Sequence, residues 1–317
     1  VVATANYEAR KFGVHSAMAV ATAHRLCPQL IVVEGHYNRY KEVSAEIHRI
    51  FHDYTDLIEP LSLDEAYLDV TTNKKNIPLA MDIAGEIKER ILADTGLTAS
   101  AGVSYCKFLA KVASDYRKPN GLCVVHPDRA IEFIDRLKVE RFWGVGEKTA
   151  KKMHSLGVFN GKQLREVPLQ KLTRVFGKMG KVFYDFSRGI DNRPVVTEWV
   201  RKSVGCERTY AEDLTSFDEM KSALTPLATD LVKRLEKSRF LGRSLVLKVK
   251  YSDFRQTTHS HTGSTPLTDF NEILSLAINL LSEVNMANRF VRLLGLSVTS
   301  PIIAETPHEG MQLTIDW

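Results

Sequence analysis

Cysteine is scarce in this sequence, and the spacing of the few cysteines excludes several kinds of site. Only four of the 317 residues are cysteines, and no two of them form a C-x-x-C pair. This pattern predicts neither a zinc site nor a disulfide framework, so we expect the protein to work in a reducing, cytoplasmic environment. The sequence also has no run that approaches the ~18 apolar residues of a membrane span, and its start lacks a signal-peptide pattern. We therefore expect no contact with a membrane.

The composition is that of an ordinary globular protein, but its charge is unevenly distributed. Apolar residues make up 44% and charged residues 26% of the chain, which is long enough for two or three domains. The formal net charge is +5. Between Lys138 and Arg193, 13 Lys or Arg stand against 5 Asp or Glu, a net of +8, so the remainder of the chain carries −3. One basic segment on a mildly acidic body predicts contact with nucleic acid; a solvated basic face is the alternative.

One stretch, residues 58–70, contains the most informative pair of side chains. Apolar and polar residues alternate from Glu65 onward, which predicts a half-buried strand, and residues 58–63 predict a second short strand before it. If the chain turns at Leu63-Asp64, both carboxylates of the Asp-Glu pair reach one site at the hairpin tip, whereas in an unbroken strand they would point to opposite faces. Paired carboxylates suit Mg²⁺ and phosphoryl transfer. A solvated acidic turn is the alternative.

The pattern up to residue 126 predicts a ferredoxin-like sheet from which one strand is missing. Helices are expected at 37–54, 78–93 and 104–117, and further strands at 97–103 and 122–126. Ser104 is the expected cap of the third helix. A ferredoxin-like domain begins with a strand, so the missing strand belongs before the first of these helices or further upstream. Because the sequence also begins at Val1 without Met, we expect that a preceding segment completes the sheet.

A second strand-helix-strand-strand-helix-strand order is expected in residues 202–300, after a linker at 192–201. Its elements are expected near 202–210, 217–238, 244–254, 256–265, 269–284 and 290–299. Lys248 and Lys250 alternate with apolar residues, so they point away from the core. Together with Lys202 they predict a basic sheet face that follows a duplex backbone. Basic side chains on an exposed sheet are also ordinary solubility devices, which is the alternative.

Between these regions lies a basic motif with two glycines, FWGVGEKTAKK at residues 142–152. Its hydrophobic-Gly-hydrophobic-Gly pattern predicts a helix-hairpin-helix, in which Gly144 and Gly146 let the backbone approach a phosphate at the next helix N-terminus. Three lysines of the following helix add attraction that is independent of sequence: Lys148, Lys151 and Lys152. A looser copy of the motif occurs at 176–181. The alternative is a helical hairpin whose glycines serve only tight packing.

Three further side chains are suited to a polyphosphate. Tyr7 and Arg10 lie three residues apart, so on a helical turn they share a face and place a hydroxyl beside a guanidinium. Lys118 stands just before a Pro-Asn-Gly turn and can reach a phosphate beside the sheet; a charge favoured at a helix C-terminus is the alternative.

The tail from 301 to 317 has no core of its own and ends in alternating apolar residues behind a glutamine. Its anchors are Gln312, Leu313, Ile315 and Trp317. An extended peptide of this kind fits a groove on a partner protein, and a frayed terminus is the alternative.

Four of these segments make the chain resemble the Y-family DNA polymerases over essentially all of its length. They are TANYEARKFG at 4–13, SLDEAYLD at 62–69, KPNG at 118–121 and RKSVG at 201–205. The resemblance implies an α+β architecture with small helical fingers, a ferredoxin-like palm, a helix-hairpin-helix thumb and a second ferredoxin-like domain, the little finger. The implied domains are fingers at 1–34, palm at 35–126, thumb at 127–191, linker at 192–201, little finger at 202–300 and a clamp-binding tail at 301–317.

The resemblance also implies roles for matching residues. Asp64 and Glu65 would be metal-binding catalytic carboxylates, with Glu65 nearest the primer 3′-OH, and two Mg²⁺ ions would be the cofactors. Tyr7, Arg10 and Lys118 would hold the triphosphate of the incoming nucleotide. DNA contacts would come from the thumb motif and from the basic face of the little finger. The tail would bind the replicative sliding clamp, and the protein would be a monomer.

The implied activity is DNA-directed DNA synthesis of the error-prone translesion type, in damage tolerance and repair. The sequence departs from the family at two points. The family's first palm strand, with an Asp-x-Asp metal set and an aromatic gate against ribonucleotides, lies upstream of Val1, so the chain alone need not be active. Trp143 replaces the Pro more usual before the thumb glycines. A noncatalytic DNA- and clamp-binding protein with a degenerate polymerase fold, and a nuclease using the same carboxylates, remain the alternatives.

Overall fold

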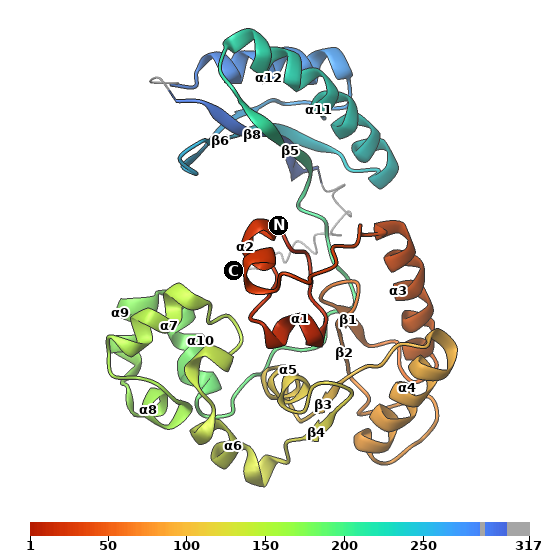
Figure 1. Cartoon of the computed structure of the whole chain (residues 1–317). Coiled ribbons are helices and arrows are strands. Elements are labelled where there is room, and N and C mark those ends of the chain that lie inside the picture. Colours follow the sequence, from red (N-terminus) through yellow and green to blue (C-terminus); the bar gives the residue numbers. More distant parts are fainter. Residues whose placement is uncertain (286–288, 303–317) are drawn as a thin grey trace, which may run out of the picture. The chain divides into compact units, whose positions relative to one another are not determined.

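The computed structural model describes residues 1–285 and 289–302, and the chain divides into two units, Val1–Glu198 and Trp199–Trp317 (Figure 1). Within the described residues, no helix has both the length and the apolar character needed to cross a membrane. The mixed helix and strand content agrees with the α+β class expected from the sequence.

The N-terminal unit begins with two short helices that share a small core of their own. They are α1 (Tyr7–Lys11) and α2 (Val20–Leu26). The side chain of Asn6 caps α1 by accepting a hydrogen bond from the Ala9 amide (2.9 Å). Ala9, Ala23 and Cys27 are buried between the two helices, which turns the first residues of α1 toward solvent.

Two long helices and two separate pairs of short strands follow. The elements are α3 (Tyr37–His52), β1 (Ile58–Pro60), β2 (Ala66–Leu68), α4 (Ala80–Thr95), β3 (Ala101–Val103), α5 (Lys107–Tyr116) and β4 (Leu122–Val124). Strands β1 and β2 pair antiparallel, and β3 and β4 pair parallel, so the described strands form two two-stranded sheets. Helices α3 and α4 lie against each other around Ile50, Tyr54 and Ile87.

Two details of the sequence prediction were wrong in this region. Strand β3 begins at Ala101, although a strand was expected from residue 97, because its ladder with β4 starts only at the pair Ala101 and Leu122. Ser104 does not cap α5: its hydroxyl donates to the Val125 carbonyl (2.9 Å) and ties the loop after β3 to the strand beside it. Cys106 occupies the cap position of α5 instead.

The rest of the N-terminal unit is helical. Its elements are two 3₁₀ turns, η1 (Pro127–Arg129) and η2 (Val139–Arg141), and the helices α6 (Ala130–Arg136), α7 (Glu147–His154), α8 (Gly161–Glu166), α9 (Leu169–Phe176) and α10 (Lys178–Phe186). These helices share one core with α5, in which the rings of Phe108 and Phe186 stack at 4.2 Å between centroids. Residues 190–202 then run without helix or strand, as expected of a linker.

The C-terminal unit is a four-stranded antiparallel sheet whose one face is covered by two helices (Figure 1). The elements are β5 (Ser203–Leu214), α11 (Phe217–Ser238), β6 (Gly242–Tyr251), β7 (Gln256–Thr262), α12 (Phe270–Ser282) and β8 (Val291–Pro301), and the strand order is β5-β8-β6-β7. The element order is the one predicted. Ser216 and Glu219 form a reciprocal capping box at the start of α11, so the helix begins at Phe217.

Candidate active site

The β1–β2 hairpin brings the two candidate carboxylates to one tip. The Glu65 carbonyl accepts hydrogen bonds from the amides of Leu61 (2.8 Å) and Ser62 (3.3 Å), which reverses the chain between the strands. The Ser62 hydroxyl donates to Asp64 Oδ1 (2.6 Å), and both carboxylate side chains are exposed. The chain therefore turns where the sequence predicted a turn, and the Asp-Glu pair is not part of an unbroken strand.

Two lysines from α5 and its C-terminal loop lie beside this tip. Lys111 Nζ is 3.0 Å from Glu65 Oε1. Lys118 Nζ is 2.5 Å from Asp115 Oδ1, and this hydrogen bond raises the pKa of Lys118, with smaller contributions from the charges of Asp115, Glu65 and Tyr7. Lys111 therefore gives the acidic tip a positive flank, and the raised pKa of Lys118 keeps its ammonium group charged.

The first helix supplies the other candidates for a polyphosphate site. Tyr7 and Arg10 lie one turn apart on α1, and the ring of Tyr7 is 49% exposed. Arg10 Nε donates to the Ala5 carbonyl (2.8 Å), which fixes the guanidinium at the start of the helix. Tyr7 and Arg10 therefore share a helical turn, as their spacing predicted.

The donor set at the tip fits a hard divalent cation. The two carboxylates are exposed and offer oxygen ligands only. Among residues 1–285 and 289–302 there is no group of three or more His, Cys, Asp and Glu side chains that could hold a metal ion. Mg²⁺ commonly keeps several waters and is bound by one or two carboxylates together with substrate phosphates. The pair at the tip therefore suits a shared site with a phosphate substrate better than a closed protein site.

A cluster of buried charges holds strand β1 to the segment 191–196, which we call the strap. Glu59 Oε2 accepts hydrogen bonds from Lys107 Nζ (2.5 Å) and from the Val196 amide (2.7 Å). Lys107 Nζ also donates to the Pro194 carbonyl (2.9 Å), and its side chain is only 9% exposed. Burial raises the pKa of Glu59, but the hydrogen bonds from Lys107 and Val196 outweigh it, so that the pKa lies below its usual value.

A second ion pair fixes the start of the strap. The Asp191 carboxylate, 2% exposed, accepts from the Phe108 amide (2.9 Å) and from the guanidinium of Arg193 (2.7 and 2.8 Å). Burial opposes ionisation of Asp191, yet the bonds from Arg193 and Phe108 leave its pKa lowered. Arg193 also lies over the ring of Trp143 (4.8 Å to the centroid). The Trp at this position therefore has a partner of its own in the strap.

The aromatic neighbour of Glu59 completes the cluster. Tyr67 is paired with Glu59 across the β1–β2 ladder and is buried. Lys107 Nζ lies 5.1 Å from the centre of the Tyr67 ring. Burial raises the pKa of Tyr67 to about 12, so its hydroxyl stays neutral near the ion pair. These buried charges lie along the strand that leads to Asp64.

Sequence reasoning missed this cluster, although two signals pointed to it. Glu59 is a charged residue inside a short apolar strand, and buried charges need a partner. Lys107 occupies the first position of α5, where the helix dipole disfavours a cation, so a specific carboxylate partner is required there. The partners themselves lie 48 and 87 positions away in the chain, and local pattern does not reveal them.

The two thumb-motif glycines differ in their surroundings. Gly144 adopts φ +81°, and a Cβ there would meet the Met179 side chain at 3.1 Å, so it serves the turn and close packing. Gly146 stands at the cap position of α7 with open space where its Cβ would be. Close packing therefore does not require a glycine at position 146.

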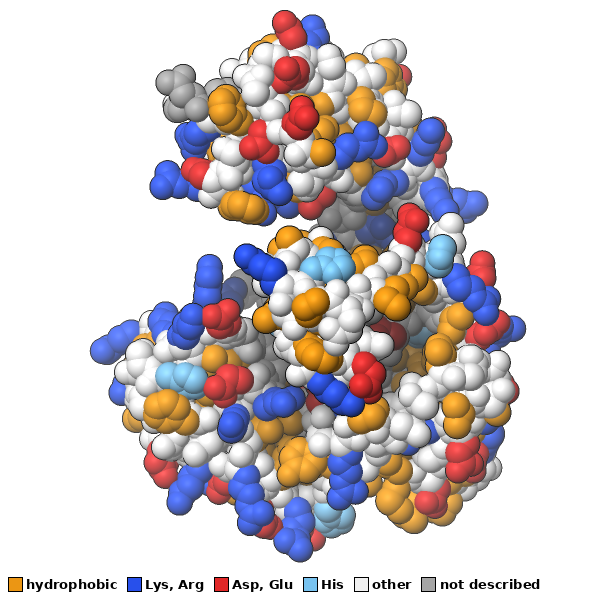
Figure 2. All heavy atoms as spheres, viewed as in Figure 1, with side chains coloured by type: hydrophobic (Ala, Val, Ile, Leu, Met, Phe, Trp, Pro, Cys, Tyr) orange, Lys and Arg blue, Asp and Glu red, His pale blue; other side chains and the backbone are white. Residues whose placement is uncertain are grey.

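The lysines of α7 are exposed, but two of them have partners. Lys151 pairs with Glu147 (2.6 Å), and Lys152 donates to the Val175 carbonyl (2.6 Å). Lys148 is exposed and has no hydrogen bond or ion pair to any described residue. On the face drawn in Figure 2, Lys and Arg side chains stand out over the region that Figure 1 labels α6 to α10.

The basic residues of the C-terminal unit lie where the alternation predicted. Lys248 and Lys250 are half-buried on the sheet face opposite the core, and they alternate with the buried residues Leu247, Val249 and Tyr251. Lys248 pairs with Glu207 of β5 (2.7 Å), so the basic face is partly neutralised. Lys202 is exposed just before β5. The tail anchors Gln312, Leu313, Ile315 and Trp317 lie outside the described residues.

Comparison with known proteins gives concordant matches along the chain. The impB/mucB/samB family matches residues 1–115, the C-terminal domain of that family matches 201–315, and the DNA polymerase-iota thumb domain matches 141–191. A DNA polymerase IV of Bacteroides fragilis is 55% identical over 311 residues, which cover 98% of this chain and 85% of the relative. A DNA polymerase IV of Clostridioides difficile is 48% identical over 301 residues, 95% of this chain and 82% of the relative.

Solved structures agree with these matches. A Y-family DNA polymerase chimera of Dbh and Dpo4 superposes with a TM-score of 0.87 at 27% identity, over 95% of this chain and 88% of the chimera. An insertion ternary complex of Dbh DNA polymerase gives a TM-score of 0.63 at 26% identity over the same shares of the two chains.

Proposed function

The chain belongs to the Y family of DNA polymerases, and we propose that its catalytic centre is the tip of the β1–β2 hairpin. As a member of this family it is a DNA-directed DNA polymerase, a nucleotidyltransferase of the translesion type that depends on a divalent metal. The observation that carries the proposal is the turn that places Asp64 and Glu65 side by side at an exposed tip, next to the ammonium groups of Lys111 and Lys118.

The two carboxylates supply oxygen ligands, and we assign them to a site for two Mg²⁺ ions. When bound, the metal lowers the pKa of the primer 3′-OH and neutralises charge on the α-phosphate and the leaving pyrophosphate. Glu65 is the carboxylate nearest the primer 3′-OH in this assignment. The Lys111–Glu65 pair (3.0 Å) restricts the orientation of that carboxylate before substrate arrives. The buried Glu59–Lys107 pair holds the strand on which the tip stands.

The triphosphate of the incoming nucleotide is assigned to Tyr7, Arg10 and Lys118. A tyrosine hydroxyl and a guanidinium donate hydrogen bonds to phosphate oxygens, and a lysine adds a mobile positive charge. Lys118 is paired with Asp115 in the structure, so it exchanges a carboxylate for a phosphate when the nucleotide binds. The raised pKa of Lys118 keeps it charged for this exchange.

We assign primer-template DNA to two surfaces, one in each unit. In the first, Gly146 leaves the N-terminus of α7 open to a phosphate and Lys148 lies free beside it. The open space at Gly146 favours this role over tight packing alone. In the second, Lys248 and Lys250 line the sheet face opposite the core, and Lys202 is exposed just before β5. Base pairing with the template supplies the sequence, and the protein grips the backbone.

The remaining assignments follow the family's organisation. Fingers, palm, thumb, linker and little finger are proposed at 1–34, 35–126, 127–191, 192–201 and 202–300. The tail from residue 301 is proposed to bind the replicative sliding clamp through Gln312, Leu313, Ile315 and Trp317. The protein is proposed to act as a monomer in the cytoplasm.

Primer extension by the full-length natural protein tests the catalytic assignment. With primer-template, deoxynucleotides and Mg²⁺, Asp64→Asn and Glu65→Gln should each lower the extension rate about 10³-fold, since the lost charge stabilisation amounts to several kcal/mol. Asp69→Asn is the matched control, because this carboxylate lies just after the same hairpin and only accepts from the Thr71 amide (2.9 Å). DNA affinity should stay within about twofold in all three variants, because the DNA grip lies elsewhere.

Three outcomes would overturn the assignment. Shortened primers without extension would identify a nuclease, and tight DNA binding with no extension by the wild-type protein would identify a noncatalytic binding protein. Near wild-type extension by Asp64→Asn or Glu65→Gln would remove the hairpin tip from the active site.

A further inference from the structure

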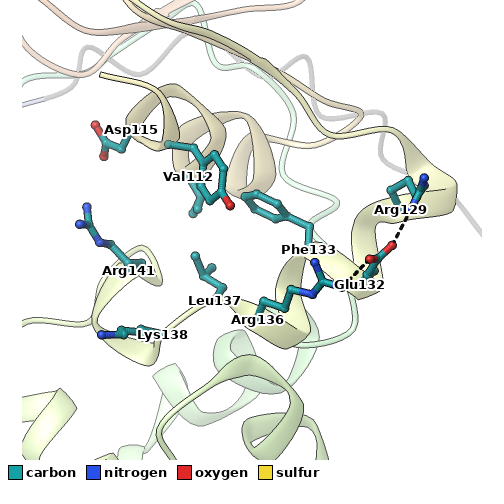
Figure 3. Close-up of a pocket in the computed structure, with 10 residues that line it drawn as sticks. Val112, Asp115, Arg129, Glu132, Phe133, Arg136, Leu137, Lys138 and Arg141 are labelled. Atoms are coloured by element: carbon teal, nitrogen blue, oxygen red, sulfur yellow. Dashed lines mark hydrogen bonds and ion pairs between the residues drawn. The ribbon is translucent and has the colours of Figure 1, made fainter. Parts of the chain in front are cut away.

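A pocket of about 540 Å³ lies within the N-terminal unit, between α5, α6 and η2 (Figure 3). Its size falls in the range of small-molecule sites, ~300–1,000 Å³. The apolar part is made by Val112 and Tyr116 of α5, Phe133 of α6, and Leu137. None of these residues has a part in the catalytic site described above.

The charges around the pocket are of two kinds. Arg129 and Arg136 both pair with Glu132 (2.8 Å each), which neutralises that edge of the pocket (Figure 3). Lys138 and Arg141 lie on the other side of Leu137, and neither has an ion pair or side-chain hydrogen bond to a described residue. The pocket therefore has one edge with two cations that pair with no described residue, and its other carboxylate, Asp115, is paired with Lys118. This edge favours an anionic occupant.

An exposed aromatic ring stands over the apolar part. Tyr116 is 64% exposed, and its ring centroid is 5.4 Å from that of Phe133, with the planes tilted by 58°. Tyr116 is therefore largely open to solvent, and Val112 and Leu137 line the same pocket. An aromatic face next to free cations is the combination that binds single-stranded nucleic acid, by base stacking and phosphate contact.

We propose that this pocket binds one nucleotide of single-stranded DNA, with the base stacked on Tyr116 and the backbone phosphate held by Lys138 and Arg141. The inference rests on the chain being a DNA polymerase but not on the roles of Asp64 and Glu65. An acidic peptide would satisfy the two cations as well, but it does not use a free aromatic face, so the structure favours DNA. The strand can come from the unpaired template of the bound substrate or from a separate molecule.

The pocket is also coupled to the nucleotide site through one residue. Asp115 lines the pocket and is the hydrogen-bond partner of Lys118 (2.5 Å). Arg141 and Asp115 lie on the same side of the pocket (Figure 3). A phosphate held near Arg141 therefore repels the charged Asp115 carboxylate, weakens its pair with Lys118 and leaves Lys118 available for the triphosphate. Occupation of the pocket should therefore lower the KM for the incoming nucleotide without changing the DNA affinity of the main site.

Fluorescence anisotropy on the full-length protein tests the proposal. The protein is first saturated with an unlabelled blunt hairpin primer-template, and a labelled short oligothymidylate is then titrated. The wild-type protein should bind it, and Tyr116→Ala should weaken that binding about tenfold, the scale of one lost base stack. Tyr116→Phe, which keeps the ring, should bind like the wild type. Because Tyr116 is exposed, the alanine variant should fold, and its unfolding curve should show this.

A charge-reversal pair with a matched control tests the cation edge. Lys138→Glu with Arg141→Glu should abolish binding of the oligonucleotide, whereas Lys171→Glu with Arg174→Glu, the same charge change on exposed residues of α9, should leave it within about twofold. If a hairpin with a 5′ overhang blocks the labelled strand, the occupant is the template in cis; if it does not, the occupant is a second strand. Both outcomes support the site.

Three results would overturn the proposal. The first is that the hairpin-saturated wild-type protein does not bind the oligonucleotide. The second is that the Lys171→Glu with Arg174→Glu control loses as much binding as the Lys138→Glu with Arg141→Glu variant. The third is that the Lys138 and Arg141 substitutions abolish binding of an acidic peptide but not of DNA. Asp64→Asn should retain the second-site binding in every case, so a failure of the catalytic assignment and a failure of this one are distinguishable.

Discussion

The β1–β2 hairpin and the C-terminal sheet hold their strands by different means. Three residue pairs join β1 to β2, whereas β6 makes seven pairs with β7 and nine with β8. Alternate residues of β6 are buried against α11 and α12, including Leu247 and Val249, both 0% exposed. An isolated two-stranded hairpin is at best marginally stable in water. The hairpin therefore needs support from outside its own ladder.

Part of that support is apolar, since Leu68 packs against the core between α3 and α4, and part is ionic and comes from distant parts of the N-terminal unit. Glu59 is held by Lys107 and by the Val196 amide, and Asp191 fixes the strap through Arg193 and the Phe108 amide. A buried ion pair carries a desolvation cost that nearly cancels its attraction, but removal of one partner leaves a buried, uncompensated charge. Strand β1 of the candidate site is therefore held in part by directional bonds to distant residues, whereas the C-terminal sheet is stabilised by apolar burial.

The largest expected effect comes from removing the ionic support of the β1–β2 hairpin. Glu59→Ala should lower the free energy of unfolding of the N-terminal unit by about 3–5 kcal/mol, because it leaves Lys107 buried without a counter-ion. Hydrogen exchange should show faster opening of β1 and β2 with unchanged protection of β6. Glu59→Gln keeps an acceptor for the Val196 amide, so its free energy of unfolding should lie between those of the wild type and Glu59→Ala. Wild-type protection of β1 in Glu59→Ala would show that the ladder alone holds the hairpin.

A truncation in the core of the C-terminal unit tests the apolar support of its sheet. Leu247→Ala should destabilise the C-terminal unit by about 2–5 kcal/mol, the usual cost of a cavity at a fully buried leucine. The same exchange experiment should show loss of protection in β6 and β8 only, and single-nucleotide insertion should keep its kcat. A fall in protection of β1 as large as that of β6 would contradict the separate support of the two sheets.

Acid should act more strongly on the hairpin than on the C-terminal sheet. Glu59 and Asp191 have lowered pKa values in the folded protein, so the stability they contribute is present above their unfolded pKa values, near 4, and is lost as the pH falls through the folded values. Protection of β1 should therefore decline below about pH 5 before that of β6. Glu59→Gln should flatten this decline. An equal pH dependence in wild type and variant would remove Glu59 as its cause.

The smallest expected effect is on the salt dependence of DNA binding, for which a lysine without an ion pair is compared with one that is paired. Lys148→Ala should lower the slope of log affinity for DNA against log salt by about 0.9, the contribution of one phosphate contact. Lys248→Ala should lower it less, because Lys248 is already neutralised by Glu207 at 2.7 Å. Equal slopes for the two variants would show that the Glu207 pair opens when DNA binds.

The sequence predicted the C-terminal unit better than the catalytic hairpin, for a physical reason. The bounds of α11 follow from local signals, a helical period and the Ser216 capping box, so residues 217–238 were predicted correctly. Local pattern also predicted two short strands around Asp64, and the structure pairs them as β1 and β2. The strap was predicted only as a linker, because its contacts join residues 59, 107 and 191–196, which no periodicity connects. Ser104 was assigned to a cap for a similar reason, since its true partner Val125 lies 21 residues away.

The most direct test of the account is the single-turnover rate of nucleotide insertion by Glu65→Gln, measured beside its DNA affinity and beside Asp69→Asn. If the hairpin tip is the catalytic centre, the rate should be about 10³-fold below wild type at saturating nucleotide and Mg²⁺, with DNA affinity unchanged and Asp69→Asn near wild type. Near wild-type insertion by Glu65→Gln, or an equal loss in Asp69→Asn, would show that the hairpin tip is not the catalytic centre.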